Sequence, residues 1–259
     1  GGLAEEHALA LVPGWPADAP SGSKRLIFIR HAEGWHNKHA RELPNYHTDN
    51  LGLTETYWDA ALTPEGEEQA AWISIKMQWR QSEGIPQLIA TSPLTRAIQT
   101  VEIGFPNRTE DGAPRPPVVA TSLARERISH HQCDRRRSVS ELQDKFGSWV
   151  DFSEIASEHD DMWEEKEIHP EPFNSTRCSR RAEKLMSWLH ARSETYIAVV
   201  THWVFLTHLF ALFPHPKLYE PFDNAEMRFA CLVPRPYAER ILKHDQNRQG
   251  PANTHHDEL

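Results

Sequence analysis

The sequence has few cysteines, no long apolar run and no excess of positive charge. Its three cysteines, Cys133, Cys178 and Cys231, lie far apart. They predict neither a CxxC zinc pattern nor a disulfide framework, although one disulfide with one free thiol stays open. No apolar run of roughly eighteen residues is present, so no segment is expected to span a membrane. The net charge of −9 argues against general binding of nucleic acids.

Motifs that mark several metal and cofactor sites are missing as well. The chain has no HExxH zinc motif, no Walker A loop and no GxGxxG turn. Sixteen histidines nevertheless suggest a metal site or acid–base chemistry. The adjacent pairs His130–His131 and His255–His256 are poor ligand sets, because neighbouring side chains on a regular element diverge. We therefore expect no metal and no cofactor, and we expect most histidines to be solvated or structural.

The composition that is present predicts a folded chain with one main domain. Of the 259 residues 39% are apolar and nine are tryptophan, which argues against disorder. A single domain is expected over residues 23–243, after a loose arm rich in Ala, Gly and Pro at 1–22. The polar tail at 244–259 ends in HDEL at 256–259, an endoplasmic-reticulum retention address. The expected location is the cytoplasm, or the lumen of that organelle if a signal sequence was removed.

Short apolar segments alternate with helical segments along this domain. The expected strands are 25–29, 88–91, 118–121, 196–201 and 229–233, and the expected helices are 64–82, 93–103, 138–146, 152–165, 177–192 and 203–213. Thr63 is an N-cap, and Pro64 follows it at the first helical position. Strands that are apolar throughout are covered on both faces. The pattern therefore predicts an α/β three-layer sandwich with a mostly parallel central sheet.

Polar residues follow four of the expected strands. Arg30 and His31 follow the first strand, and Arg96 lies one turn into the helix after the second. Residues 125–127 (Arg-Glu-Arg) follow the third strand, and His202 follows the strand at 196–201. Each of these residues alone is weak evidence for a functional site, because a lone histidine is more often a cap or a packed side chain. Since ligands of such sheets bind at the carboxyl ends of the strands, the coincidence predicts a functional site there.

Four segments of the chain resemble a known family. They are RHAEGWHN at 30–37, LTPEGEEQA at 62–70, SPLTRAIQT at 92–100 and AVVTHWVFL at 198–206. In letters, order and spacing they resemble the histidine phosphatase superfamily, in its phosphoglycerate-mutase-like branch. The resemblance covers about residues 24–235 and implies the phosphoglycerate-mutase-like fold.

The resemblance also implies a role for each of the residues after the strands. His31 matches a nucleophile that forms a phosphohistidine, and His202 matches a second histidine of the phosphate pocket. Arg30 and Arg96 match two arginines that clamp the phosphate, since guanidinium groups suit phosphate bidentately. Asn37 matches a phosphate ligand, and the backbone of Trp203 is expected to face the anion at a helix N-terminus.

Glu126 matches the carboxyl group that protonates the leaving oxygen and then activates water. This double role needs a raised pKa, which burial beside an anionic ester supplies. Asp134 is the rival for the role if the loop folds differently.

The region 127–170 is expected to cover the site. Its candidate selectors for the rest of the substrate are His130, His131, Arg135, Arg136, Arg137 and Trp163. Arg136 and Arg137 are alternatively partners of Glu141 and Asp144 in ion pairs. Trp203 is a departure from the resemblance, because relatives usually carry a small residue after the second histidine. Its indole either narrows the entrance or stacks on an apolar or ring-shaped leaving group, or it points into the core beside Phe205.

The sequence thus predicts an enzyme, a phosphatase that hydrolyses a small phosphomonoester through a phosphohistidine and without a metal. A phosphomutase that uses the same residues is one alternative. A non-catalytic protein that retains a phosphate pocket is another. The expected partner is a phosphorylated small molecule, with no nucleic acid and no membrane, and the oligomeric state is left open.

Overall fold

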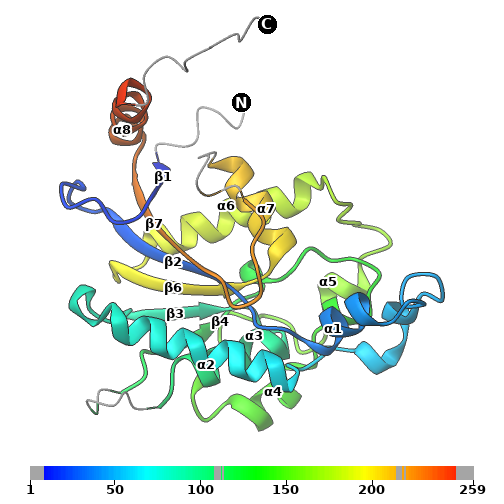
Figure 1. The fold of residues 1–259 in the computed structure, drawn as a ribbon. Coiled ribbons are helices and arrows are strands. Elements are labelled where there is room, and N and C mark those ends of the chain that lie inside the picture. The colour runs from blue at the N-terminus through cyan, green and yellow to red at the C-terminus, as the bar shows by residue number, and fades with distance from the viewer. Residues whose placement is uncertain (1–8, 108–111, 113, 214–217, 219, 249–259) are drawn as a thin grey trace, which may run out of the picture.

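A seven-stranded sheet runs through the middle of the molecule in the order β1-β7-β2-β6-β3-β4-β5 (Figure 1). The structure is a computed structural model that describes residues 9–107, 112, 114–213, 218 and 220–248. Within them the strands are β1 Leu9–Pro13, β2 Lys24–Arg30, β3 Leu88–Thr91, β4 Val118–Ala120, β5 Val150–Asp151, β6 Tyr196–Thr201 and β7 Met227–Pro234. Neighbours from β2 to β5 pair in parallel, whereas β7 is antiparallel to both β2 and β1.

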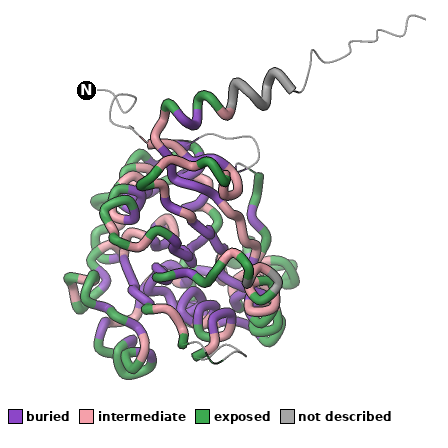
Figure 2. Tube along the Cα trace, turned by 90° about the vertical axis from the view of Figure 1, so that its left-hand side faces the viewer, coloured by how far each residue is buried: buried purple, intermediate pink, exposed green. Residues whose placement is uncertain are grey.

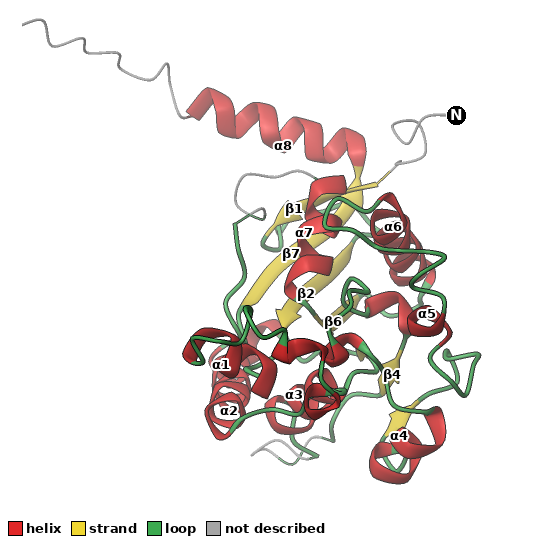
Figure 3. Cartoon of the chain, turned by 90° about the vertical axis from the view of Figure 1, so that its right-hand side faces the viewer, coloured by secondary structure: helices red, strands yellow, loops and turns green. Residues whose placement is uncertain are grey.

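Helices cover both faces of this sheet. The described helices are α1 Trp35–Glu42, α2 Pro64–Trp79, α3 Thr95–Gly104, α4 Val139–Phe146, α5 Asp161–Glu164, α6 Thr176–Ala191, α7 Trp203–Leu212 and α8 Arg235–Arg248. Short 3-10 helices lie at Leu51–Leu53, Glu55–Tyr57, Gln81–Glu83, Ser122–Ala124 and Gln132–Asp134. Figure 3 shows α6 and α7 on one side of the sheet and α2, α3 and α4 on the other. The predicted three-layer α/β sandwich with a mostly parallel sheet is confirmed.

Alternating side chains of the strands build one apolar core on each face. Leu26 and Phe28 of β2 pack with α6 and α7, whereas Ile27 and Ile29 pack with α2, α3 and α4. Each of these four residues is fully buried. A strand covered on both faces needs apolar residues at every position, which is why β2 reads as a continuous apolar run. The burial of the central strands is visible along the chain trace (Figure 2).

The start of α3 differs from the expected one. The helix begins at Thr95 and not at Pro93, and its N-cap residue, Leu94, supplies no side-chain hydrogen bond. The carboxylate of Asp59 replaces that cap, because it accepts hydrogen bonds from the Thr95 amide at 2.8 Å and the Thr95 hydroxyl at 2.7 Å. A cap that comes from a residue 36 positions away has no local signature in the sequence.

The expected loose arm at 1–22 is wrong for residues 9–13, which form β1. This strand pairs antiparallel with β7, and Leu11 and Val12 are buried in it. The strand is only five residues long, ends at Pro13 and is followed by Gly14, so it gives a weak sequence signal within a Pro- and Gly-rich segment. Residues 1–8 lie outside the described residues.

The expected boundary of the polar tail at 244 is also wrong, because α8 continues to Arg248. The first turn of α8 packs Tyr237 and Ala238 against Val12 and Val233 of the sheet. From there α8 projects away from the body of the molecule (Figure 3). The HDEL segment at 256–259 lies outside the described residues.

The region 127–170 was expected to cover the site, but its helix α4 and strand β5 pack into the core and the sheet edge, and residues between 127 and 134 line the cavity. Val139, Leu142 and Phe146 of α4 and Val150 of β5 are buried in the core beneath α2 and α3. Strand β5 adds to the sheet edge by pairing in parallel with β4. The apolar positions of this region, spaced for a helix and then a strand, explain why it packs inward.

Two expectations concern the cysteines and the membrane. All three cysteines are free and buried, so the disulfide that was left open is absent. Among the described residues, no helix has the length and apolar content that a membrane span requires.

The start of α2 packs tightly beneath the segment that follows β2. Thr63 caps the helix by accepting a hydrogen bond from the Gly66 amide at 2.9 Å, and its hydroxyl donates to Glu33 at 2.8 Å. The amide of Thr63 donates to the Glu33 carbonyl at 2.9 Å. A Cβ on Gly66 would lie only 2.1 Å from that carbonyl oxygen. The glycine therefore allows two backbone segments to touch directly below the catalytic-histidine candidate.

We expect Gly66→Ala to lower the free energy of unfolding by about 1–3 kcal/mol, because the added methyl group forces the two segments apart. Urea denaturation measures the change. Glu67→Ala is the matched control, since this side chain is exposed on the same helical turn, and it should change stability by less than about 0.5 kcal/mol. Equal stability of Gly66→Ala and the control would contradict the packing argument.

Candidate active site

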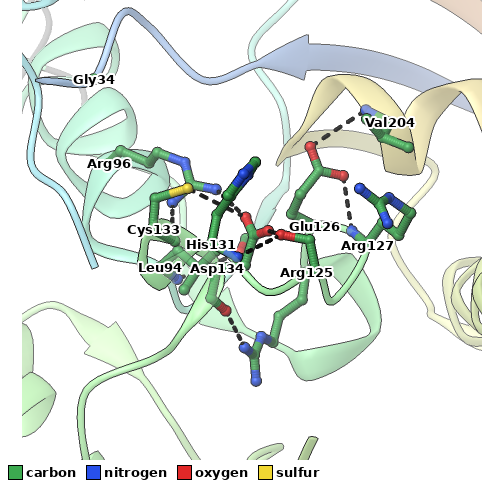
Figure 4. Close-up of polar contacts among 12 residues, drawn as sticks. Gly34, Leu94, Arg96, Arg125, Glu126, Arg127, His131, Cys133, Asp134 and Val204 are labelled. Carbon is green, nitrogen blue, oxygen red and sulfur yellow. Dashed lines mark hydrogen bonds and ion pairs between the residues drawn. The ribbon is translucent and has the colours of Figure 1, made fainter. Parts of the chain in front are cut away.

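The carboxyl ends of the parallel strands surround a cavity of about 150 Å³. Its walls come from the carboxyl end of β2, the start of α1, the first turn of α3, the segment after β4 and the start of α7. The lining residues are Arg30, His31, His36, Asn37, Arg96, Glu126, Arg127, Ser129, His131, Cys133, Asp134, Trp203 and Val204. The structure thus brings together most of the residues that the strand ends predict, and Figure 4 shows several of them.

The His31 ring is held in one orientation and one tautomer. Its Nδ1 lies 2.7 Å from the carbonyl oxygen of Ala32, which can only accept, so Nδ1 carries the hydrogen. The Nε2 atom then keeps its lone pair, and it accepts a hydrogen bond from Nε of Arg96 at 3.2 Å. Burial, reinforced by Arg96 and Arg30, holds the pKa of His31 well below its ordinary value. The imidazole is therefore neutral at pH 7, as a nucleophile must be.

The two arginines approach this ring from different elements. Arg96 projects from α3 and is almost fully buried, with Nη1 donating to the Cys133 carbonyl and Nη2 lying 3.4 Å from Asp134 Oδ1. Arg30 ends β2, and its Nη1 donates to the carbonyl of Phe222 at 2.6 Å. Its Nε is buried without a hydrogen-bond partner. Both guanidinium groups therefore place positive charge at the cavity beside His31.

Two further imidazoles stand next to His31. The ring of His202, at the N-cap of α7, lies with its centroid 4.9 Å from that of His31. The ring of His36 lies 5.9 Å away. Burial is the main cause that lowers the pKa values of both well below the ordinary value, with Arg96 the next. The neutral rings of His31 and His36 line the cavity, whereas the predicted second histidine, His202, is fully buried beside His31 and is not among the lining residues.

The nitrogen atoms of these imidazoles include several without partners. Both ring nitrogens of His202 and Nδ1 of His36 are buried with no hydrogen bond. A buried polar atom left unpaired costs about 1–3 kcal/mol, so the site is built to receive a ligand that pairs with them. Together with two guanidinium groups, the chemistry that fits is an oxyanion.

His36 is a site residue that the sequence reasoning did not select. The residue belongs to the segment HAEGWHN, and the glycine two positions earlier makes room for its ring. A Cβ on Gly34 would stand 3.0 Å from two atoms of the His36 ring. In the sequence, the signal for His36 is the order Gly-Trp-His-Asn at 34–37, in which a glycine stands two positions before the histidine.

The carboxylate of Glu126 binds the first turn of α7 (Figure 4). It accepts hydrogen bonds from the amides of Phe205 at 2.8 Å and Val204 at 3.3 Å, and from its neighbour Arg127 at 2.8 Å. Burial and the nearby Asp134 raise the pKa of Glu126, whereas the amide hydrogen bonds of Arg127 and Phe205 lower it. The net direction is upward, which suits a group that gives up and takes back a proton near neutral pH.

Asp134 lines the same cavity but has other partners. Its Oδ1 lies 3.4 Å from Nη2 of Arg96, and its Oδ2 accepts a hydrogen bond from the Ser129 hydroxyl. Glu126 accepts its hydrogen bonds from backbone amides, and the charge of Arg96 lowers its pKa without outweighing burial and Asp134. The geometry therefore favours Glu126 over Asp134 as the acid.

Two buried ion pairs hold the backbone around the two carboxyl groups. Arg181 of α6 pairs with Glu171 at 2.9 Å and donates to the carbonyl of Glu126 at 3.0 Å. Arg125 pairs with Asp160 and donates to the carbonyl of Asp134. All four charged side chains of these pairs are buried, so removing one would leave its partner uncompensated. These pairs anchor the only part of the expected cover that reaches the cavity.

The other predicted residues divide into those that reach the cavity and those that do not. Asn37, His131 and Trp203 line it, and Asn37 also accepts a hydrogen bond from the Gly34 amide at 3.1 Å. The predicted contact between a phosphate and the backbone of Trp203 stays a prediction. The Trp203 side chain is 41% exposed, so it does not point into the core beside Phe205.

Three expected selectors lie away from the cavity. His130 is exposed and stands 3.6 Å from Glu167. Arg135 lies over the ring of Trp58, 4.3 Å from its centroid, because that face and Glu55 offer it partners. Trp163 is buried in the molecule with Lys166 over its ring. These side chains have partners elsewhere, and the spacing along the chain does not show this.

Arg136 and Arg137 do not reach the cavity either. Arg137 pairs with Glu141 at 3.9 Å, as the ion-pair alternative expects, and it also lies over the Trp58 ring. Arg136 is buried and donates to backbone carbonyls of residues 137 and 157–159. No ion pair between Arg136 and Asp144 is found among the described residues.

A second cavity, of about 560 Å³, shares no lining residue with the first. Its walls include Trp35, Tyr57 and Trp58, with Arg137 and Lys145 at its edge. None of the residues predicted at the carboxyl ends of the strands lines this second cavity. Its larger volume alone does not make it the candidate active site. Across the described residues, no group of three His, Cys, Asp or Glu side chains is arranged to hold a metal ion.

The lowered pKa values of the three imidazoles predict how stability depends on pH. Below pH 6.5 the unfolded chain protonates these rings and the folded protein does not, so the free energy of unfolding falls as the pH falls. Each ring contributes at most about 1.4 kcal/mol per pH unit. Glu126 acts in the opposite direction, because its raised pKa lets the folded protein bind a proton first.

We expect His36→Asn to make stability less dependent on pH between pH 7 and 5.5, because one buried neutral imidazole is lost. Urea denaturation at several pH values measures the slope. His47→Asn, at an exposed position, is the control and should keep the wild-type slope. If His36→Asn kept it as well, the His36 ring would not be buried in neutral form.

Comparisons with known proteins identify relatives of the chain. A scan against protein-family models finds no match. A phosphoglycerate mutase-like protein of Arabidopsis thaliana is 30% identical over 242 residues, which cover 82% of this chain and 85% of that protein. Phosphoglycerate mutase-like protein 1 of the same plant is 30% identical over 241 residues, which cover 82% of either chain.

Solved structures include similar folds. The phosphoserine phosphatase of Entamoeba histolytica, in complex with 3-phosphoglyceric acid, is 22% identical with a TM-score of 0.42, over 79% of this chain and 88% of that one. The identity and coverage of the plant relatives decide the family. The chain belongs to the phosphoglycerate-mutase-like proteins of the histidine phosphatase superfamily.

Proposed function

We propose that this protein is a phosphatase that hydrolyses small phosphomonoesters through a phosphohistidine at His31, without a metal ion. The observation that carries the proposal is the hydrogen bond from Nδ1 of His31 to the Ala32 carbonyl. It leaves a neutral imidazole whose Nε2 lone pair faces Arg96 at the cavity. A histidine that only packed in the core would not need two guanidinium groups beside it.

In the first step Nε2 of His31 attacks the phosphorus atom, and the bond between phosphorus and the ester oxygen breaks. Arg30 and Arg96 neutralise the charge on the phosphoryl oxygens, which is the part that Mg²⁺ plays in other phosphotransferases. The unpaired rings of His36 and His202 donate hydrogen bonds to the oxygens of the same group through their N–H. Glu126 gives its proton to the leaving oxygen, so an alcohol departs and the carboxyl group becomes a carboxylate.

In the second step a water molecule attacks the phosphohistidine. Glu126, now ionised, takes a proton from the water, and the bond between phosphorus and Nε2 breaks. Inorganic phosphate forms, His31 is again neutral, and Glu126 is again protonated. The amides of Val204 and Phe205 support the ionised form between the two steps, because they donate to the carboxylate at a helix N-terminus.

His31→Ala should abolish phosphatase activity, because no other imidazole in the cavity has its tautomer fixed by a backbone carbonyl. Substrate labelled with radioactive phosphate, followed by an alkaline quench, should leave label on the wild-type chain that acid removes. His47→Ala is the control and should retain turnover and labelling, since His47 is exposed outside the site. Turnover at the wild-type rate by His31→Ala would refute the phosphohistidine mechanism.

Glu126→Gln should slow esters of alkyl alcohols about 10²- to 10⁴-fold, the usual contribution of a positioned general acid. For p-nitrophenyl phosphate, the variant should slow formation of the phosphohistidine far less, because the p-nitrophenolate leaving group needs no proton. The two substrates are compared by the initial burst of alcohol or phenol release. Asp134→Asn, the matched variant of the rival carboxyl group, should not discriminate between them. Equal losses on both substrates in Glu126→Gln would remove Glu126 as the acid.

A further inference from the structure

Trp203 is the only tryptophan, tyrosine or phenylalanine among the residues that line the 150 Å³ cavity. It occupies the first position of α7, directly after His202, and its side chain is 41% exposed. The guanidinium carbon of Arg30 lies 5.9 Å from the centroid of its ring. A cation at this distance attracts the indole face, so the ring has a reason to stay at the cavity although much of it faces solvent.

Trp203 borders the cavity next to the helix amide that binds Glu126. Glu126, which would protonate the leaving oxygen, is bound to the amide of Val204, the residue after Trp203. Glu126 therefore contacts the helical turn that carries the indole. Of the groups that would hold the phosphate, His31 and Arg96 come from other elements, whereas His202 is the N-cap of α7 and Arg30 lies beside the indole. A substrate whose ester oxygen faces Glu126 must pass its leaving group beside Trp203.

The rest of the rim has few partners to offer an apolar leaving group. Arg127 donates to the carbonyl of Glu171 at 2.8 Å, Ser129 donates to Asp134, and His131 is exposed. These side chains are polar or already engaged. The flat face of Trp203 is the one large apolar surface at this rim among the described residues, and a saturated chain would use it less well than a ring.

We propose that the substrates of this site are phosphomonoesters whose leaving group carries a flat unsaturated ring, which stacks on Trp203. The inference rests on the proposed function, since it takes the phosphate end of the substrate to lie at His31. An aromatic contact of this kind changes binding or rate about 2- to 12-fold beyond the effect of buried area.

Benzyl phosphate and cyclohexylmethyl phosphate test the proposal, because both release a primary alcohol of similar size and only one ring is flat. In the wild type, kcat/KM should favour benzyl phosphate by about 2- to 12-fold. Trp203→Leu should bring this ratio close to one, mainly through loss on benzyl phosphate, and Trp203→Phe should keep part of it. Trp72→Leu, an exposed tryptophan of α2 outside the cavity, should leave the ratio unchanged.

A wild-type ratio near one, or the wild-type ratio retained in Trp203→Leu, would overturn the stacking proposal. Binding of benzylphosphonate and cyclohexylmethylphosphonate, measured by calorimetry, separates this result from a failure of the proposed function. If no phosphomonoester is hydrolysed but benzylphosphonate binds more tightly in a Trp203-dependent manner, the ring platform stands and the phosphatase proposal falls. If the two phosphonates bind equally, or neither binds, the platform falls.

Discussion

The hydrogen bonds from the amides of Val204 and Phe205 to the Glu126 carboxylate join the separate parts of this site. They tie the segment after β4 to the start of α7, and so set the acid at a fixed place relative to the second histidine, His202. The same turn carries the exposed indole of Trp203. The first amides of a helix have no partner within the helix, and here the Glu126 carboxylate accepts from two of them. The side chain that caps α7 is therefore also the one proposed as the acid.

Charge in this protein is arranged locally and not over the whole chain. The net charge of −9 would repel an anionic substrate if it were spread evenly. At the cavity, Arg30 and Arg96 face the site while the nearby imidazoles stay neutral, because their burial lowers their pKa values. Neutral imidazoles can both donate and accept hydrogen bonds, so they add pairing capacity without repelling the guanidinium groups. The acidic remainder of the surface bears on solubility.

Much of this arrangement follows from the sequence, because the carboxyl ends of parallel strands must meet. Arg30, His31 and His202 could be placed together for that reason alone. The selectors could not, since Arg135 and Trp163 have partners that only the folded chain brings near. His36 was missed because its ring has room only where Gly34 lacks a side chain. Such a steric effect leaves no periodic pattern in the sequence. Strand β1 was missed because pairing with β7, at the far end of the chain, outweighs its weak local pattern.

The unpaired nitrogens of His36 and His202 do not distinguish an ester from the free anion. Their N–H groups would donate to phosphoryl oxygens whether or not an alcohol is attached, so the pocket has as much reason to hold inorganic phosphate as to hold the substrate. Under the proposed function, the end of a catalytic cycle therefore leaves a bound inhibitor in place. How fast phosphate escapes past Trp203 then sets a ceiling on turnover, and the phosphate concentration around the protein determines how often the site is free.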